Sequence, residues 1–149
     1  MSKSLITNKK AHLNYEFLEK FNAGIELFGF EVKALRENQG SLEGAHVVIR
    51  NNEAYLVNTH IPPYQPANTP KEYDPYRTRR LLLTKKEIRH LSGVEKQQRL
   101  TIVPISMYND GNKIKVEIAI VRGKKKFDKR EDIKKRETDR DIRRSLKRE

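Results

Sequence analysis

The side chains that most often perform catalysis or bind metals are sparse and scattered in this 149-residue chain. The chain has no cysteine, and its four histidines, His12, His46, His60 and His90, are isolated from one another. No pair of them has the spacing of zinc ligands, and no Gly-x-Ser-x-Gly motif presents a nucleophilic serine. The aspartates and glutamates are dispersed as well. We therefore expect no metal site, no cofactor and no enzymatic activity.

One short segment, Gly123-Lys124-Lys125-Lys126, has some likeness to the end of a phosphate-binding loop. Such a loop needs another glycine five positions earlier, and a serine or threonine after the lysine to bind magnesium. Both are missing here. The segment therefore does not predict nucleotide hydrolysis.

Basic side chains are numerous enough to indicate a different chemistry. Lysine and arginine number 32 against 20 aspartates and glutamates, which gives a net charge of +12. Cations that neutralise phosphates release counterions, so clusters of them favour nucleic-acid binding. Here the clusters lie on separate elements, which favours a large folded nucleic acid, although a solvated surface is the alternative. The clusters are Lys9-Lys10, Lys33 with Arg36, Arg77 to Arg80, Lys113 with Lys115, and Lys124 to Lys126.

Aromatic residues favour RNA over DNA as the partner. Tyr15 and the tyrosines of a proline-rich segment, Tyr64, Tyr73 and Tyr76, could stack on unpaired bases. No helix-turn-helix, zinc-finger or basic-zipper pattern indicates recognition of a DNA groove. A place in the core is the alternative for Tyr15.

The charge divides the chain into a body, residues 1–122, and a basic tail, residues 123–149. Each part carries +6, but the tail does so in only 27 residues. Its four large apolar residues are Phe127, Ile133, Ile142 and Leu146, too few to offset the entropy of ordering it. We expect the tail to be disordered when the protein is free and helical when it binds a polyanion. A solvated tail without a partner is the alternative.

Two helices are indicated in the body. Phe28, Val32 and Leu35 fall on one face of a short helix, with Lys33 and Arg36 on another. The second helix begins after Thr84-Lys85-Lys86-Glu87, which has the pattern of a capping box. Its buried face is expected to include Leu83, Ile88 and Leu91.

The strands are indicated by alternation and by turn residues. One hairpin is expected over residues 47–57 with a turn at Asn51-Asn52, and another over 101–121 with a turn at 109–112. The second arm, 113–121, is expected to have one buried and one exposed face. A further strand pair over 15–27 is expected to turn at Asn22-Ala23-Gly24, and residues 58–80 form a surface loop. The predicted fold class is mainly β with accessory helices, a small antiparallel β-barrel of the OB type.

Other protein classes are excluded by composition. No stretch approaches the roughly 18–20 apolar residues of a membrane span, and no segment has the apolar core of a signal peptide. The absence of cysteine excludes a secreted domain stabilised by disulfides. The expected location is the cytoplasm, without membrane association.

Several segments together resemble the SsrA-binding protein family, SmpB, the bacterial partner of transfer-messenger RNA in ribosome rescue. The resemblance runs from about Asn8 to Arg130, and its strength lies in the order and spacing of the segments. They are Asn8-Lys9-Lys10-Ala11, Ala23-Gly24-Ile25-Glu26-Leu27, Glu31-Val32-Lys33-Ala34-Leu35-Arg36, Asp74 to Leu83, Lys115-Val116-Glu117 and Gly123 to Arg130. The sequence departs from the family pattern at Asn22, where an acidic residue is common, and at His12-Leu13.

The resemblance implies an RNA-binding function without catalysis. A member of this family binds the tRNA-like part of transfer-messenger RNA and delivers it to stalled ribosomes for trans-translation, which tags the incomplete proteins. Its basic tail, residues 123–149 here, would become helical on the ribosome, along the empty messenger channel at the decoding centre. The resemblance further implies elongation factor Tu and alanyl-tRNA synthetase as partners through the RNA, and a monomeric protein. The alternative function is that of a structural ribosomal protein or a general RNA-binding protein without a rescue role.

The resemblance also implies two sets of contact residues. Those facing transfer-messenger RNA are Lys9, Lys10, Tyr15, Lys33, Arg36, Leu82 and Lys115. For Leu82 the alternative is a role in the core. Those facing the ribosome are Gly123, Lys124, Lys125, Phe127, Asp128, Lys129 and Arg130.

Overall fold

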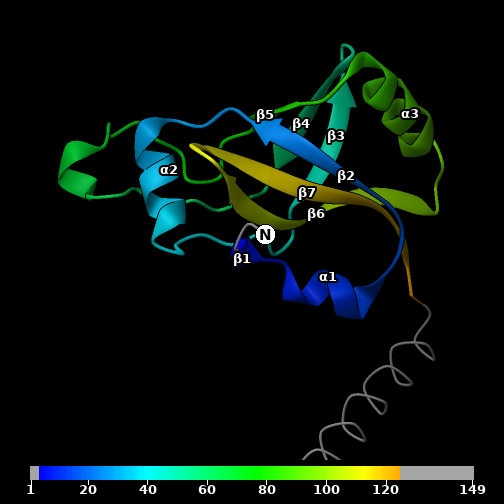
Figure 1. Cartoon of the computed structure of the whole chain (residues 1–149), viewed down its shortest axis with the longest axis horizontal. Coiled ribbons are helices and arrows are strands. Elements are labelled where there is room, and N and C mark those ends of the chain that lie inside the picture. The colour runs from blue at the N-terminus through cyan, green and yellow to red at the C-terminus, as the bar shows by residue number, and fades with distance from the viewer. Residues whose placement is uncertain (1–3, 125–149) are drawn as a thin grey trace, which may run out of the picture.

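A computed structural model describes residues 4–124 of the chain, which form one antiparallel sheet with helices around it (Figure 1). The strands are β1 (Ser4–Thr7), β2 (Tyr15–Ile25), β3 (His46–Arg50), β4 (Glu53–Val57), β5 (Arg79–Leu82), β6 (Leu100–Asp110) and β7 (Lys113–Gly123). The helices are α1 (Lys9–Asn14), α2 (Gly29–Arg36), α3 (Lys85–Glu95) and the short 3₁₀ helix η1 (Pro66–Asn68). The mainly β fold class with accessory helices is confirmed.

The sheet is not a closed barrel. Its strand order is β1-β6-β7-β2-β5-β4-β3, so β1 and β3 are its two edges. Strand β3 approaches β6, but within residues 4–124 no ladder of hydrogen bonds joins them. Helix α3 lies beside this opening, where Glu95 accepts a hydrogen bond from the Ile49 backbone N–H at 2.7 Å. The expectation of a barrel is therefore correct only in a loose sense.

Both predicted hairpins are confirmed. Strands β3 and β4 pair in register around Asn51 and Asn52, whose φ angles are 51° and 62°. Strands β6 and β7 pair around Gly111, with a φ of 63°. Two-residue hairpin turns require positive φ, and Asn and Gly adopt it at the least cost.

The strand pair predicted over residues 15–27 is wrong. Strand β2 is continuous through Asn22-Ala23-Gly24 and pairs along its length with β7 before it pairs with β5. Gly24 serves close approach and not a turn, because a Cβ atom there would lie 3.1 Å from the Leu82 Cβ. A local turn signal was overridden by pairing with strands distant in sequence.

The prediction of one exposed face on β7 is also incomplete. Its apolar residues Ile114, Val116, Ile118 and Ile120 are buried in the main core, as expected. Ala119 and Val121, on the other face, are buried as well, in a second cluster with Ala11 of α1. Helix α1 therefore covers the end of the sheet that the alternation had left exposed.

The two helices predicted from the sequence are present in the structure, but not every residue assigned to them lies where it was expected. Helix α3 has its Thr84–Glu87 capping box, and Leu91 is buried as expected. Helix α2 buries Leu35, but Phe28 precedes the helix and is 49% exposed, so the prediction that Phe28 shares a helix face with Val32 and Leu35 is wrong. The sequence interpretation missed β1, α1 and β5, and β5 begins inside the predicted surface loop.

None of the helices within residues 4–124 is both long enough and apolar enough to cross a membrane.

Candidate nucleic-acid interface

A row of residues across three strands forms the floor of a groove on the sheet. In the register of the sheet, Gly24 of β2 lies between Leu82 of β5 and Lys115 of β7. Because glycine has no side chain, Leu82 leans over the strand and Lys115 flanks it on the other side. Leu82 is 48% exposed, so the alternative of a core role for this residue is wrong. An apolar surface and a cation are thus placed side by side.

Two adjoining hollows extend this row. One, of about 600 Å³, continues over Arg80 and the start of α3, and the other, of about 230 Å³, continues towards α2. Both include Gly24, Leu82 and Lys115 in their lining. We call this combined surface the sheet groove.

Helix α2 brings its cations to the same end of the sheet. Val32 lines the smaller hollow, and Lys33 and Arg36 are exposed on the helix. The Arg36 guanidinium donates a hydrogen bond to the carbonyl oxygen of Asn112 at 3.1 Å. This contact joins α2 to the β6–β7 turn beside Lys113. Of the seven residues expected to face RNA, Leu82 and Lys115 line the groove, Arg36 contacts Asn112 at its edge, and Lys33 lies exposed on the adjoining helix α2.

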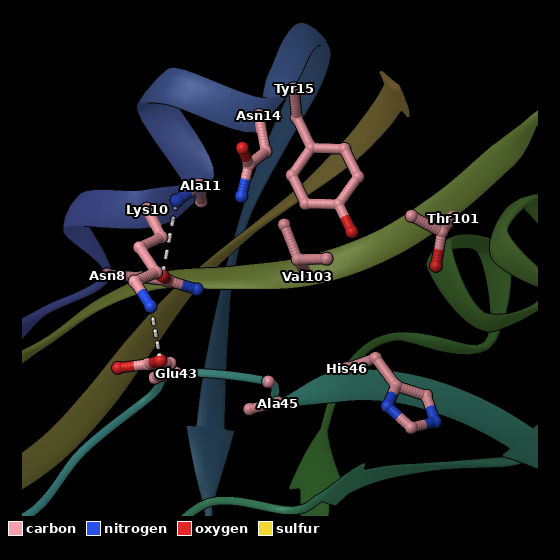
Figure 2. A pocket seen from close by; sticks show the side chains of 11 residues that line it. Asn8, Lys10, Ala11, Asn14, Tyr15, Glu43, Ala45, His46, Thr101 and Val103 are labelled. Atoms are coloured by element: carbon pink, nitrogen blue, oxygen red, sulfur yellow. Dashed lines mark hydrogen bonds and ion pairs between the residues drawn. The ribbon is translucent and has the colours of Figure 1, made fainter. Parts of the chain in front are cut away.

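The other three expected RNA contacts lie on or beside α1. Lys10 and Tyr15 line a separate hollow of about 320 Å³ between α1, β3 and β6, shown in Figure 2. The Tyr15 ring points into this hollow and is also partly buried against the second core cluster, so its RNA and core interpretations both have support. Lys10 pairs with Glu43 at 2.6 Å, and both side chains are largely exposed. Such a pair contributes little stability, so an RNA phosphate can compete for the lysine.

Asn8 holds α1 in place. Its side-chain oxygen accepts a hydrogen bond from the Ala11 N–H at 3.3 Å and so caps the helix (Figure 2). Its side-chain nitrogen donates to the carbonyl oxygens of Pro104 and Leu42 at 3.0 and 3.4 Å. The buried asparagine thereby fixes the orientation of Lys9 and Lys10 relative to the sheet.

The beginning of the predicted ribosome contacts adjoins α1. Gly123 pairs with Tyr15 across the sheet, and the Lys124 backbone N–H donates to the Asn14 carbonyl oxygen at 2.9 Å. The Lys124 ammonium donates to the His12 carbonyl oxygen at 3.3 Å. The predictions for Lys125, Phe127, Asp128, Lys129 and Arg130, and for the disorder or helix of the tail, lie outside the described residues.

The expected contacts thus fall into two groups, at opposite ends of the β2–β7 pair (Figure 1). Tyr15 and Gly24 are nine residues apart on β2. At about 3.3 Å per residue, this separates the groups by up to ~30 Å. A partner that touches both groups must therefore be large.

Only part of the basic cluster Arg77 to Arg80 is exposed at the surface. Arg79 and Glu31 are both 0% exposed and form an ion pair, with 2.8 Å between Arg79 Nε and Glu31 Oε2. Arg77 pairs with the other oxygen of Glu31. Arg80 is exposed and pairs with Glu26 and Glu53, each at 3.1 Å. The prediction that this cluster faces a nucleic acid is wrong for Arg79, because its charge is used inside the fold.

The tyrosines of the proline-rich segment divide in the same way. The Tyr73 hydroxyl donates to Glu31 at 2.9 Å, and Tyr64 packs against the main core. Tyr76 is 56% exposed. Of these three predicted stacking residues, only Tyr76 has an open surface.

Within this buried cluster, Glu31 keeps its negative charge. Burial acts to raise the pKa of Glu31, but hydrogen bonds from Arg77 and from the Phe28 N–H, together with the charge of Arg79, outweigh it and lower the pKa. Burial, and then the hydrogen bond to Glu31, raise the pKa of Tyr73 to about 12. The carboxylate therefore stays ionised, and the tyrosine stays protonated as its donor.

Comparison with known proteins bears on the whole chain. The family model described as "SmpB protein" matches residues 5–148. The chain belongs to the SmpB family. It is 52% identical over 147 residues to an SsrA-binding protein of Thermosipho africanus, with 98% of each chain covered. It is 46% identical over 146 residues to one of Microcystis aeruginosa, with 98% of this chain and 95% of the relative covered.

A solved structure is similar to this SmpB-family chain as well. It is described as "tmRNA-SmpB: a journey to the center of the bacterial ribosome". The two are 40% identical, with a TM-score of 0.68, over 80% of this chain and 84% of that one. The family resemblance stated from the sequence is confirmed.

Asn22 and His12, at which this SmpB-family chain departs from the family pattern, make specific contacts in the structure. Asn22 accepts a hydrogen bond from the Tyr108 hydroxyl at 2.7 Å and lines the sheet groove near Lys115. His12 packs against Phe17 with ring centroids 4.8 Å apart. Asn22 pairs with Glu117 in an unbroken stretch of the β2–β7 register, and His12 lies in α1, outside the sheet.

Sequence reasoning missed two residues that shape the interface. Gly24 was interpreted as part of a turn, and Glu31 was not singled out although it joins α2 to β5. The sequence signal for Glu31 was its place on the buried side of a helix, three positions after Phe28. The Glu31 carboxylate accepts a hydrogen bond from the Phe28 backbone N–H. Within residues 4–124, no group of three or more histidines and carboxylates could hold a metal ion.

Proposed function

We propose that this SmpB-family chain binds transfer-messenger RNA and delivers it to stalled ribosomes for trans-translation, so that incomplete proteins are tagged. Its relatives are named for binding SsrA RNA, and the similar solved structure is described as tmRNA-SmpB in the bacterial ribosome. The proposal includes cytoplasmic action as a monomer, without catalysis. It also includes elongation factor Tu and alanyl-tRNA synthetase as partners through the RNA.

One observation carries the RNA-binding part of the proposal, namely the composition of the sheet groove. Leu82 offers an exposed apolar surface beside Lys115, and Lys33 and Arg36 border the same end of the sheet. Folded RNA is recognised through its phosphates and through unstacked bases in loops. In the proposal the cations bind phosphates, and Leu82 packs against a base or ribose exposed in a loop.

The second group of residues supports a division of labour. Lys9, Lys10 and Tyr15 adjoin Gly123 and Lys124, the first residues of the basic tail. In the proposal, this end of the sheet faces both RNA and the ribosome, and the tail from residue 123 enters the messenger channel at the decoding centre. The roles of Lys125, Phe127, Asp128, Lys129 and Arg130 on the ribosome, and helix formation there, remain part of the proposal.

Two variants of the groove test RNA binding directly. Lys115→Gln and Leu82→Ala should each weaken binding to transfer-messenger RNA by about tenfold, as expected for one lost contact of about 1.4 kcal/mol. Lys71→Gln, which removes a cation outside both groups, is the control. Equal affinities for all three variants would contradict the placement of the interface.

Deletion of residues 131–149 separates binding from rescue. The shortened protein should bind transfer-messenger RNA as the full chain does, but fail to support tagging on ribosomes stalled without messenger. Loss of RNA affinity on deletion would contradict the division of labour. Stoichiometric presence in unstalled ribosomes on a gradient would favour a structural ribosomal protein instead.

A further inference from the structure

Helix α3 presents a basic face that the proposed contacts do not use. At 100° per residue, Lys85, Lys86, Arg89 and Lys96 fall within about one third of the helix circumference. All four are exposed, whereas Leu91 and Val94 on the opposite side are buried. The helix thus packs with one side and leaves a cationic side open.

The carboxylates of α3 do not neutralise this face. Glu87 is used at the start of the helix, where it accepts hydrogen bonds from the N–H and hydroxyl of Thr84 at 3.0 Å. Glu95 accepts from the Ile49 N–H and pairs with Arg50. Both acidic groups are therefore committed to the fold.

The cations near the start of α3 also have no partners of their own. Across the described part of the chain, Lys85, Lys86 and Arg89 form no ion pair or side-chain hydrogen bond, whereas Lys10, Arg80 and Lys115 all have carboxylate partners. Two of the three, Lys85 and Lys86, lie in the first turn, where the positive end of the helix dipole disfavours cations. Glu87 in the same turn complements the helix dipole but is committed to the Thr84 cap, so the charges of Lys85 and Lys86 have no carboxylate partner of their own and are open to an anion outside the fold.

The basic face is continuous with the sheet groove. Lys85 lines the larger hollow together with Leu82 and Lys115. A polyanion that lies in the groove therefore reaches the start of α3 without crossing an intervening surface. By contrast, Lys96 follows the other end of the helix, about 16 Å away at 1.5 Å per residue.

We propose that Lys85, Lys86 and Arg89 extend the RNA interface onto α3 by binding backbone phosphates of the transfer-messenger RNA that occupies the sheet groove. This inference rests on the proposed function, because it assigns the same RNA to the neighbouring surface. Phosphate contacts carry no base readout, so the helix adds affinity and orientation but not sequence specificity.

The salt dependence of binding tests the proposal. The variant K85Q/K86Q/R89Q is compared with K71Q/K96Q/R99Q, which removes the same charge from exposed positions away from the groove. Three lost phosphate contacts should reduce the slope of log K against log salt by about 2–3, and reduce affinity at 0.15 M salt by about fortyfold or more. The control variant should keep the wild-type slope within about 0.5. Circular dichroism establishes that both variants are folded.

Chemical labelling of the wild-type protein gives an independent check. Acetylation of lysines should slow at Lys85 and Lys86 when transfer-messenger RNA is bound, while Lys96 reacts as before. Equal loss of affinity in the two triple variants would show a mere effect of net charge and would overturn the proposal, as would unchanged labelling of Lys85 and Lys86. If the folded wild-type protein does not bind the RNA at all, the proposed function fails instead.

Discussion

Replacement of Glu31 by glutamine is the sharpest test of how the interface is held. Glu31 is a buried carboxylate between two arginines, and Arg79 beside it has no solvent contact. Its oxygens also accept hydrogen bonds from the Tyr73 hydroxyl at 2.9 Å and the Phe28 N–H at 2.8 Å. Glutamine has nearly the same shape, so the change removes one charge and one acceptor without leaving a cavity.

The loss of stability in Glu31→Gln follows from the charge of Arg79, which remains after the substitution. Arg79 would keep neutral acceptors, the carbonyl oxygens of Thr59 and Pro75 at 2.7 and 3.0 Å, but no counterion. Removal of one partner from a buried ion pair destabilises by about 3–5 kcal/mol. For a domain of this size, about 4 °C per kcal/mol gives a fall in Tm of roughly 12–20 °C.

The assay is urea or thermal unfolding followed by circular dichroism at several pH values. The pKa of Glu31 is lowered in the folded state from its usual value of 4.5. Its contribution is therefore complete above about pH 4.5 and is lost as the pH falls through the folded pKa. The difference in free energy of unfolding between wild type and Glu31→Gln should be constant between about pH 6 and 8, and shrink below about pH 4.5.

Glu26→Gln provides a matched control. Glu26 also pairs with an arginine, Arg80 at 3.1 Å, but both side chains are about half exposed. An exposed pair of this kind contributes about 0–1 kcal/mol. Equal effects of the two substitutions, or a Glu31→Gln loss below about 1 kcal/mol, would refute the reasoning that burial makes the Glu31 cluster essential.

Three further predictions concern residues that position the interface. Gly24→Val should leave the protein folded but reduce affinity for transfer-messenger RNA at least tenfold, because its Cβ would press on Leu82 in the sheet groove; Gly29→Val, with open space around it, is the control for the binding assay. Asn8→Ala should cost about 2 kcal/mol in urea unfolding, since it removes the cap of α1 and leaves the Pro104 carbonyl oxygen without this donor. Thr84→Ala should cost about 1 kcal/mol, and Thr84→Ser should restore most of it, as unfolding measurements would show.

The parts of the fold that could be predicted from sequence depend on neighbouring residues. The Asn51-Asn52 turn and the Thr84 capping box are complete within a few positions of the chain, and both are confirmed. The continuous strand β2 could not be predicted in this way. Its path through Asn22-Ala23-Gly24 is set by β7, about 90 residues later, and no local pattern contains that information.

The candidate site shows the same limit. Residue type and family resemblance identified Leu82, Lys115 and Arg36, and the fold places the first two in one groove and Arg36 at its edge. They also grouped Arg79 with the surface cations, although it is buried against Glu31. A run of arginines in sequence does not show which guanidinium meets a carboxylate 48 residues away, so charge counting overestimates the available surface.

Helix α2 explains why the buried cluster matters for binding. It has only eight residues, and isolated helices of this length are not stable in water. Its orientation therefore depends on what it buries, Glu31 and Leu35, while Lys33 and Arg36 lie on its exposed side. Tyr73, Arg77 and Arg79 hold Glu31 from the proline-rich segment and β5, the same strand that carries Leu82. One cluster of hydrogen bonds thus fixes α2 relative to the strand that forms the groove. The spacing between the cations of α2 and the apolar surface of Leu82 is consequently fixed before RNA binds.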